Sequence, residues 1–146
     1  MCYNVRIMRG NNAALGKIMQ PVQIQKLNTS VYVAPIPDDF CDETELLPAE
    51  RQAQISAIGN PKVKTQKRFV WKLLRFALER RLGISADLVN FSRSGNKWSC
   101  AECRISLSHT DGYVAVALSD LPVGVDVEVL SSKFSEKLLD RIACPP

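Results

Sequence analysis

Two carboxylates two residues apart are the strongest candidates for metal chemistry in this sequence. In the segment 123–129, V-G-V-D-V-E-V, valines alternate strictly with Gly124, Asp126 and Glu128. Side chains two apart share one face of a strand, so we expect the valines to enter a core and the two acids to point outward together. Mg²⁺ takes one or two carboxylates, keeps several waters and is completed by substrate phosphates. The pattern is typical of such a site, and also of a half-exposed strand whose acids lie in water.

The only histidine of the chain, His109, follows Ser106, Leu107 and Ser108 at the expected end of another strand. Polar groups at such turns are commonly presented to ligands. A serine hydroxyl and an imidazole could both bind a phosphate there. A structural or merely exposed histidine is the alternative.

The five cysteines do not form a framework. Cys100 and Cys103 make a single C-x-x-C pair, and the remaining cysteines (Cys2, Cys41 and Cys144) lie far from it in the sequence. A structural zinc site wants four ligands, and a second pair at suitable spacing is absent. A thioredoxin-type redox motif needs a strand-to-helix turn, which the surrounding sequence does not predict. We therefore expect reduced thiols in a cytoplasmic protein.

Charge is segregated along the chain. An acidic cluster occupies residues 38–50, and residues 62–81 then carry eight Lys or Arg and a single acid, Glu79. Such a local field favours an anionic partner: nucleic acid, an acidic protein or a phosphorylated small molecule. A solvated helix face is the alternative.

Length and composition indicate one soluble domain. The chain has 146 residues, of which 46% are hydrophobic and 23% charged. No apolar run approaches the roughly 18 residues that a membrane span needs. No secretory signal precedes the cysteines, so we expect a cytoplasmic protein without a membrane partner.

The elements that must position these residues predict an α+β fold: a small, mainly antiparallel sheet with a long helix packed on one face. We expect an irregular extension over residues 1–28 and a single lobe over residues 29–130. The apolar stripe Val70, Leu73, Leu74, Ala77 and Leu78 predicts a helix over about 65–82, ended by Gly83. A shorter helix is expected around 46–58, and strands over 29–36, 88–93, 104–108, 113–118 and 123–129.

These motifs together resemble the 4'-phosphopantetheinyl transferase superfamily, in its larger two-lobed, surfactin-synthetase-activating type. The family has a similar S-H-S/T motif, then an apolar strand, then a G-[IV]-D-[IV]-E strand, which match residues 104–110 and 122–128. The helix at 71–78, the pair Glu50-Arg51 and the segment 96–98 also resemble the family. The likeness covers about Val31 to Glu128.

The resemblance implies Mg²⁺-dependent transfer of 4'-phosphopantetheine from coenzyme A to a serine of an acyl or peptidyl carrier protein. By motif match, Asp126 and Glu128 would bind the metal, and Ser108, His109 and Lys97 would contact the phosphates of coenzyme A. Lys67 and Arg68 are assigned to the extra phosphate of the nucleotide by charge alone. A positive surface would also suit an acidic carrier protein.

The sequence departs from this family at 96–98, where N-K-W replaces G-K-P, and more seriously in a missing motif. The W-x-x-K-E motif, whose Glu supplies a metal ligand or the general base, is absent, because the chain has no Lys-Glu dipeptide and no Trp after Trp98. We therefore expect residues 131–146 to start a truncated helix, the catalytic base to be unassigned, and activity of the chain alone to be reduced. A split enzyme and a non-catalytic module that binds coenzyme A or a carrier protein are the alternatives. Self-association or a partner chain would cover the exposed face of the lobe, and nucleic acid is not expected as a partner.

Overall fold

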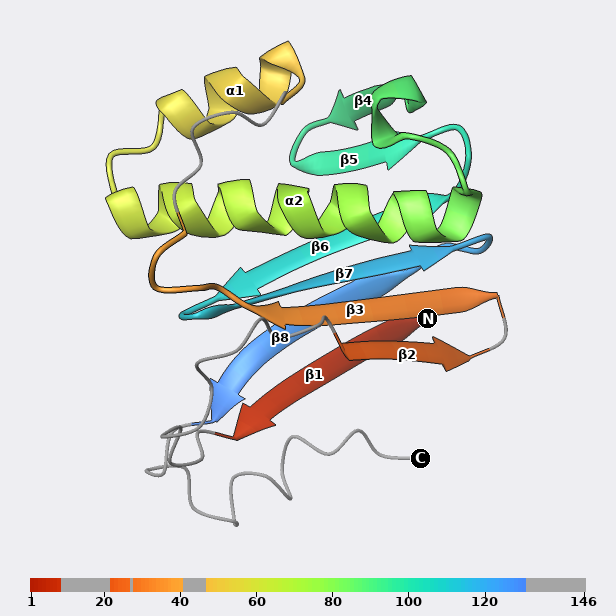
Figure 1. The fold of residues 1–146 in the computed structure, drawn as a ribbon, viewed down its shortest axis with the longest axis horizontal. Coiled ribbons are helices and arrows are strands. Elements are labelled where there is room, and N and C mark those ends of the chain that lie inside the picture. Colours follow the sequence, from red (N-terminus) through yellow and green to blue (C-terminus); the bar gives the residue numbers. More distant parts are fainter. Residues whose placement is uncertain (9–21, 27, 41–46, 131–146) are drawn as a thin grey trace.

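The computed structural model describes residues 1–8, 22–26, 28–40 and 47–130. Its elements follow in the order β1 (Cys2–Met8), β2 (Val22–Lys26), β3 (Thr29–Pro35), α1 (Ala49–Ser56), α2 (Pro61–Leu82), a 3₁₀ turn (Ala86–Leu88), β4 (Phe91–Ser94), β5 (Lys97–Cys100), β6 (Arg104–Thr110), β7 (Tyr113–Ser119) and β8 (Gly124–Leu130) (Figure 1). None of the helices in these residues is long and apolar enough to cross a membrane.

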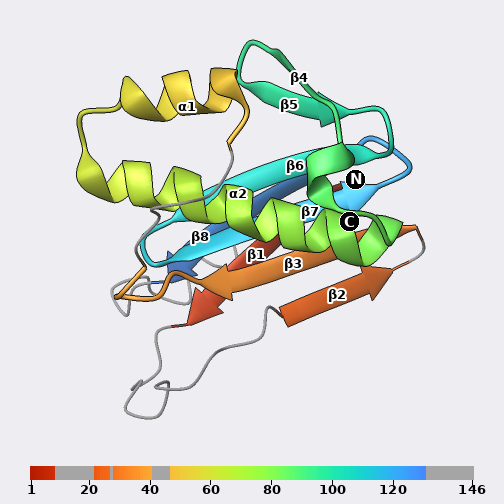
Figure 2. The ribbon, with the colours of Figure 1, turned by 45° about the horizontal axis from the view of Figure 1, so that its top comes forward.

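The main sheet has four strands in the order β2-β3-β7-β6, and all of its neighbours are antiparallel. Helix α2 lies along one face of this sheet, with α1 and the β4–β5 hairpin beyond it (Figures 1 and 2). Strands β1 and β8 form a parallel pair, which packs against the other face. The fold is therefore α+β with a mainly antiparallel sheet and a long helix on it, as the sequence predicted.

Helix α2 has clear start and stop signals. The Asn60 side chain accepts a hydrogen bond from the Lys62 N–H at 2.9 Å, and Pro61 occupies the first turn, where its missing N–H costs nothing. Gly83 ends the helix in the left-handed conformation with φ of 68°. The helix begins four residues before the expected start, because Asn60-Pro61 caps α2 and does not simply end the preceding segment.

Strand β7 is buried on both faces and separates two hydrophobic clusters. Its larger side chains, Val114, Val116 and Leu118, pack with the α2 stripe on one side. Its small ones, Ala115 and Ala117, pack on the other side against residues of β3 and β8. Because side chains alternate along a strand, the large residues support the helix and the alanines leave room for β8.

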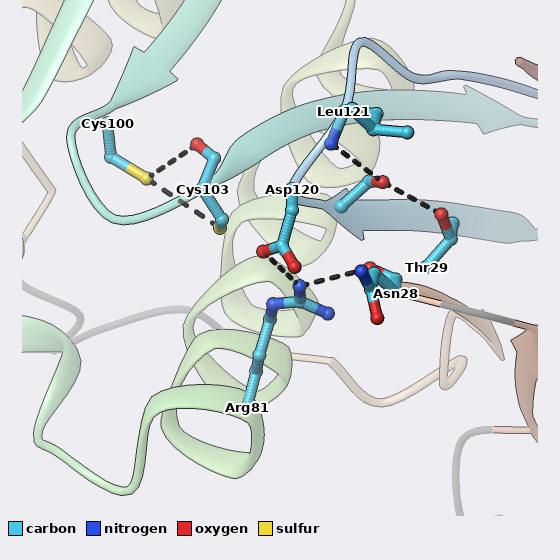
Figure 3. Close-up of polar contacts among 8 residues, drawn as sticks. Asn28, Thr29, Arg81, Cys100, Cys103, Asp120 and Leu121 are labelled. Carbon is cyan, nitrogen blue, oxygen red and sulfur yellow. Dashed lines mark hydrogen bonds and ion pairs between the residues drawn. The ribbon is translucent and has the colours of Figure 1, made fainter.

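Polar contacts join the end of α2 to the sheet. The Arg81 guanidinium pairs with Asp120 at 2.7 Å and donates to the Asn28 carbonyl oxygen at 3.0 Å (Figure 3). Beside it, the buried hydroxyls of Thr29 and Ser119 share a hydrogen bond of 2.8 Å. These contacts fix the end of α2 over the edge where β3 begins and β7 ends.

Several sequence expectations need correction. The irregular extension over residues 1–28 is wrong for the described part, which forms β1 and β2, because β8 and β3 offer strand edges with which these segments pair. The strand over 88–93 begins only at Phe91, after the 3₁₀ turn, and β5 was not expected. The helix expected within 131–146 and the cysteines Cys41 and Cys144 lie outside the described residues.

Truncation of Leu74 should destabilise the fold strongly. Its side chain is fully buried between α2 and β7, so Leu74→Ala should lower the free energy of unfolding by about 2–5 kcal/mol. Urea denaturation measures the difference, with Gln52→Ala on the exposed face of α1 as the control, expected to change it by less than about 0.5 kcal/mol. Equal effects of the two substitutions would contradict the packing described here.

Candidate functional site

His109 lies near the end of β6 on the face that α2 covers. Its Nδ1 is 3.0 Å from Oε1 of Gln66, a buried residue in the first part of α2. An amide oxygen only accepts hydrogen bonds, so Nδ1 carries the proton of the neutral imidazole and Nε2 carries the lone pair. The contact therefore fixes the orientation and tautomer of the ring.

A buried arginine lies in the same region. Arg51 of α1 is 4% exposed, and its Nη2 donates to the Lys67 carbonyl oxygen at 2.8 Å. Its Nη1 donates to Gln54 at 3.3 Å, and its guanidinium carbon lies 5.1 Å from the centre of the Trp71 ring. Arg51 thus holds the turn of α2 that carries Lys67.

Arg51, Lys67 and His109 form a basic cluster in the described part of the chain. Among the described residues, no carboxylate makes an ion pair with Arg51 or Lys67. The Arg51 Nε is buried and has no hydrogen-bond partner among them. Buried charges are usually paired, so this cluster has an unmet preference for negative charge.

The pKa values of the basic cluster are all shifted in the same direction. Burial lowers the pKa of Arg51 to about 10, so it stays protonated at neutral pH. Burial and the charge of Arg51 lower the pKa of Lys67. Burial, then Lys67, then Arg51 lower the pKa of His109. An anion bound here would raise these pKa values, because it would favour the charged forms that burial, and to a smaller extent mutual repulsion, disfavour.

Ser108 serves the opposite face of β6. Its hydroxyl donates to Asp126 Oδ1 at 3.1 Å and accepts the Val127 N–H at 3.1 Å. Two residues earlier on the same face of β6, the Ser106 hydroxyl accepts a hydrogen bond from the Val125 N–H, also at 3.1 Å. Two serine side chains of β6 therefore satisfy backbone donors of β8, and Ser108 also orients the Asp126 carboxylate.

Asp126 and Glu128 are exposed on one face of β8, and Val125 and Val127 are buried on the other, so the expected alternation is confirmed. Strand β1 lies alongside in parallel register and places Asn4 beside Asp126. It likewise places Arg6 beside Glu128. This neighbour was not predicted, because β1 is remote from β8 in the chain.

The donor set of β8 fits Mg²⁺ as a partly hydrated ion. Within the described residues there is no group of three or more His, Cys, Asp or Glu that could hold a metal. Two exposed carboxylates on one strand face nonetheless suit an ion that retains waters and takes its other ligands from phosphates. The residues present therefore fit such an ion only together with an anionic substrate.

The predicted site residues fall into separate groups. Ser108 forms a hydrogen bond with Asp126, and the charge of Lys67 contributes to the lowered pKa of His109. Although Ser108 and His109 are adjacent in the sequence, their side chains lie on opposite faces of β6. Arg68 is half-buried next to Lys67 on α2.

Lys97 begins β5 and is exposed in the β4–β5 hairpin. In the described part of the chain, it forms no hydrogen bond or ion pair with the other candidate residues. Arg51 and Gln66 were not among the predicted site residues. Gln66 had a detectable signal, since it stands four residues before Val70 on the apolar stripe of α2, where a polar residue needs a reason.

No protein-family model matches this chain, and no curated protein matches it significantly. The resemblance to phosphopantetheinyl transferases therefore stays a prediction from the motifs quoted above.

His109 should titrate below an ordinary histidine. It is the only histidine in the chain, so one imidazole proton resonance reports its pKa by NMR, with a midpoint expected below 6.5. The unfolded state then binds more protons, so the free energy of unfolding should fall as the pH drops from about 6.5 through the folded pKa. His109→Gln should remove this part of the pH dependence. A midpoint at or above 6.5 would contradict the described surroundings of the ring.

Proposed function

We propose that this chain binds coenzyme A and Mg²⁺ as the amino-terminal lobe of a two-lobed 4'-phosphopantetheinyl transferase, acting on an acyl or peptidyl carrier protein. The observation that carries the proposal is the pairing of two unlike stations around the end of β6. One is the basic cluster, for which residues 1–8, 22–26, 28–40 and 47–130 supply no ion-pairing acid. The other is the carboxylate pair on β8, linked to β6 through Ser108.

The basic cluster supplies the groups that hold phosphate. Lys67 and His109 are the half-exposed members, and the more deeply buried Arg51 supports them from behind. The Nε2 of His109 donates to a phosphate only when the imidazole is protonated, which a bound anion favours. Arg68, the next residue on α2, adds a further positive charge. A phosphate here gains charge-assisted hydrogen bonds and replaces repulsion among cations with attraction. This station suits the extra phosphate of the nucleotide.

The β8 station suits the diphosphate of coenzyme A. Asp126 and Glu128 would hold Mg²⁺, which neutralises negative charge on the diphosphate when bound. Ser108 keeps Asp126 oriented through its 3.1 Å hydrogen bond. Breaking one side of a diphosphate moves charge between oxygens, so fixed positive groups around it favour the reaction.

A ligand with phosphates at two places is what this arrangement favours. Ser108 and His109 occupy consecutive positions and serve opposite faces of the strand, so a ligand that passes around the end of β6 could contact both stations. Lys97, on the β4–β5 hairpin, is the weaker candidate for a phosphate contact. The proposal assigns no catalytic base to this chain, because the W-x-x-K-E motif is absent from it.

Coenzyme A binding should depend on Lys67. Titration calorimetry in the presence of Mg²⁺ should show binding that Lys67→Gln weakens about tenfold or more, since a hydrogen bond to a charged group contributes about 1.5–3 kcal/mol. Lys72→Gln is the matched control, because Lys72 is an exposed lysine on another side of the same helix, and should bind as the native chain does. Equal loss in both variants, or no binding by the native chain, would refute the assignment of this cluster.

Transfer should depend on the charge of Asp126. Intact-mass spectrometry of an apo carrier protein, incubated with this chain, coenzyme A and Mg²⁺, measures phosphopantetheine gain directly. Asp126→Asn keeps an oxygen for the Ser108 hydrogen bond and removes the negative charge, so any gain should disappear, whereas Glu102→Gln should leave it unchanged. Coenzyme A binding without mass gain would favour either a binding module or a split enzyme. Adding a carboxy-terminal half from a two-lobed transferase separates these two, because only a split enzyme would then gain activity.

A further inference from the structure

Two cysteines meet at the turn between β5 and β6. Cys100 is the last residue of β5 and Cys103 directly precedes β6, and their sulfurs lie 4.0 Å apart as free thiols (Figure 3). The pair is at the start of β6, whereas His109 is near its end. It is therefore separate from the site to which the proposed function refers.

The two thiols have unlike surroundings. Cys103 is 6% exposed, whereas Cys100 is partly exposed. The hydrogen bond with Cys100, followed by burial, raises the pKa of Cys103. The Cys103 thiol and, less strongly, the backbone N–H groups of Cys103 and Glu102 lower the pKa of Cys100 to about 7 against the effect of burial. A large share of Cys100 is therefore thiolate at neutral pH, and the thiolate is the reactive form.

The charged neighbours of the pair are also defined. The Glu102 carboxylate opposes thiolate formation at both sulfurs. Arg81, fixed by Asp120 and the Asn28 carbonyl, favours the thiolate at Cys103. In its protonated form, the Cys100 thiol donates to the Cys103 carbonyl oxygen at 3.4 Å. In its thiolate form, it accepts from the Cys103 thiol instead.

We propose that Cys100 and Cys103 form a reversible thiol–disulfide pair that reacts with hydroperoxides, with Cys100 as the attacking thiol and Cys103 as the resolving one. The sequence excluded a thioredoxin-type site because no strand-to-helix turn was expected, and the structure agrees, since this turn joins two strands. The turn instead places the partly exposed Cys100 sulfur 4.0 Å from the buried Cys103 sulfur.

The chemistry balances without a further reactant. The Cys100 thiolate attacks one peroxide oxygen, the O–O bond breaks, and the leaving oxygen takes up a proton, which yields water from hydrogen peroxide and a sulfenic acid on Cys100. The Cys103 sulfur then attacks the Cys100 sulfur, an S–S bond forms, and the hydroxyl departs as water with the Cys103 proton. The two sulfurs together lose two electrons, and the peroxide gains them.

Formation of the disulfide requires a small movement. An S–S bond is about 2.05 Å long, so the sulfurs at 4.0 Å must approach by about 2 Å. Residues 101–103 belong to neither a helix nor a strand, so side-chain rotation and adjustment of this turn can supply the approach.

Trypsin makes the test direct. Cleavage after Lys97 and Arg104 releases the peptide 98–104, which contains Cys100 and Cys103 and none of the other cysteines. After treatment of the folded native chain with hydrogen peroxide, this peptide should lose about 2 Da and resist iodoacetamide, and dithiothreitol should restore both thiols. A peptide that keeps two alkylatable thiols, while another cysteine of the chain is oxidised, would overturn the proposal.

Substitutions separate the two roles. Cys103→Ser should stop the reaction at a sulfenic acid on Cys100 that dimedone traps, and Cys100→Ser should leave Cys103 reduced. Cys2→Ser removes an exposed thiol on β1 and should change nothing in the peptide 98–104. Should Cys103→Ser fail to fold, the pH dependence of Cys100 alkylation in the native chain gives an independent reading. Its midpoint should lie near 7, and one near the 8.5 of an ordinary thiol would count against Cys100 as the attacking group.

Discussion

The packing of α2 across β6 and β7 is the contact on which the other features of this protein depend. Buried aliphatic and aromatic side chains on the helix meet Val114, Val116 and Leu118 of β7, and each of these strand residues is fully buried. This contact fixes the face of β6 that lies under the helix. It brings Gln66 to His109 at one end of that strand and Arg81 to Asp120 at the neighbouring edge of the sheet.

A buried charged side chain, Arg51 of α1, packs against α2, where a hydrophobic core alone would place an apolar residue. Buried arginine is costly unless hydrogen bonds or an anion compensate for lost hydration. Here Arg51 has carbonyl and amide partners and an aromatic ring, but its Nε has no partner among the described residues. Groups with such perturbed electrostatics cluster at functional sites, and a bound anion would complete the compensation of Arg51.

Strand β6 supports three kinds of chemistry along its length. Its start adjoins the thiols Cys100 and Cys103. Ser106 and Ser108 accept hydrogen bonds from backbone N–H groups of β8, and His109 near the end of β6 faces α2. The alternation of side chains keeps the serine contacts and the imidazole on opposite faces, although Ser108 and His109 are adjacent. Under the proposed function, the same alternation would let one strand contribute to both stations.

The sequence by itself determined the fold class, the span of α2 to within one turn and the outward direction of Asp126 and Glu128. These follow from periodicity and from capping at Gly83, which are local properties that neighbouring residues decide. Only the tertiary structure decided that β1 pairs with β8, that Arg51 and Gln66 join His109, and that the two thiols meet with unequal burial. Strand partners far apart in the chain and the burial of a charged side chain depend on which surfaces pack together. A local pattern, such as the polar Gln66 in the apolar stripe of α2, indicates a contact but does not identify its partner.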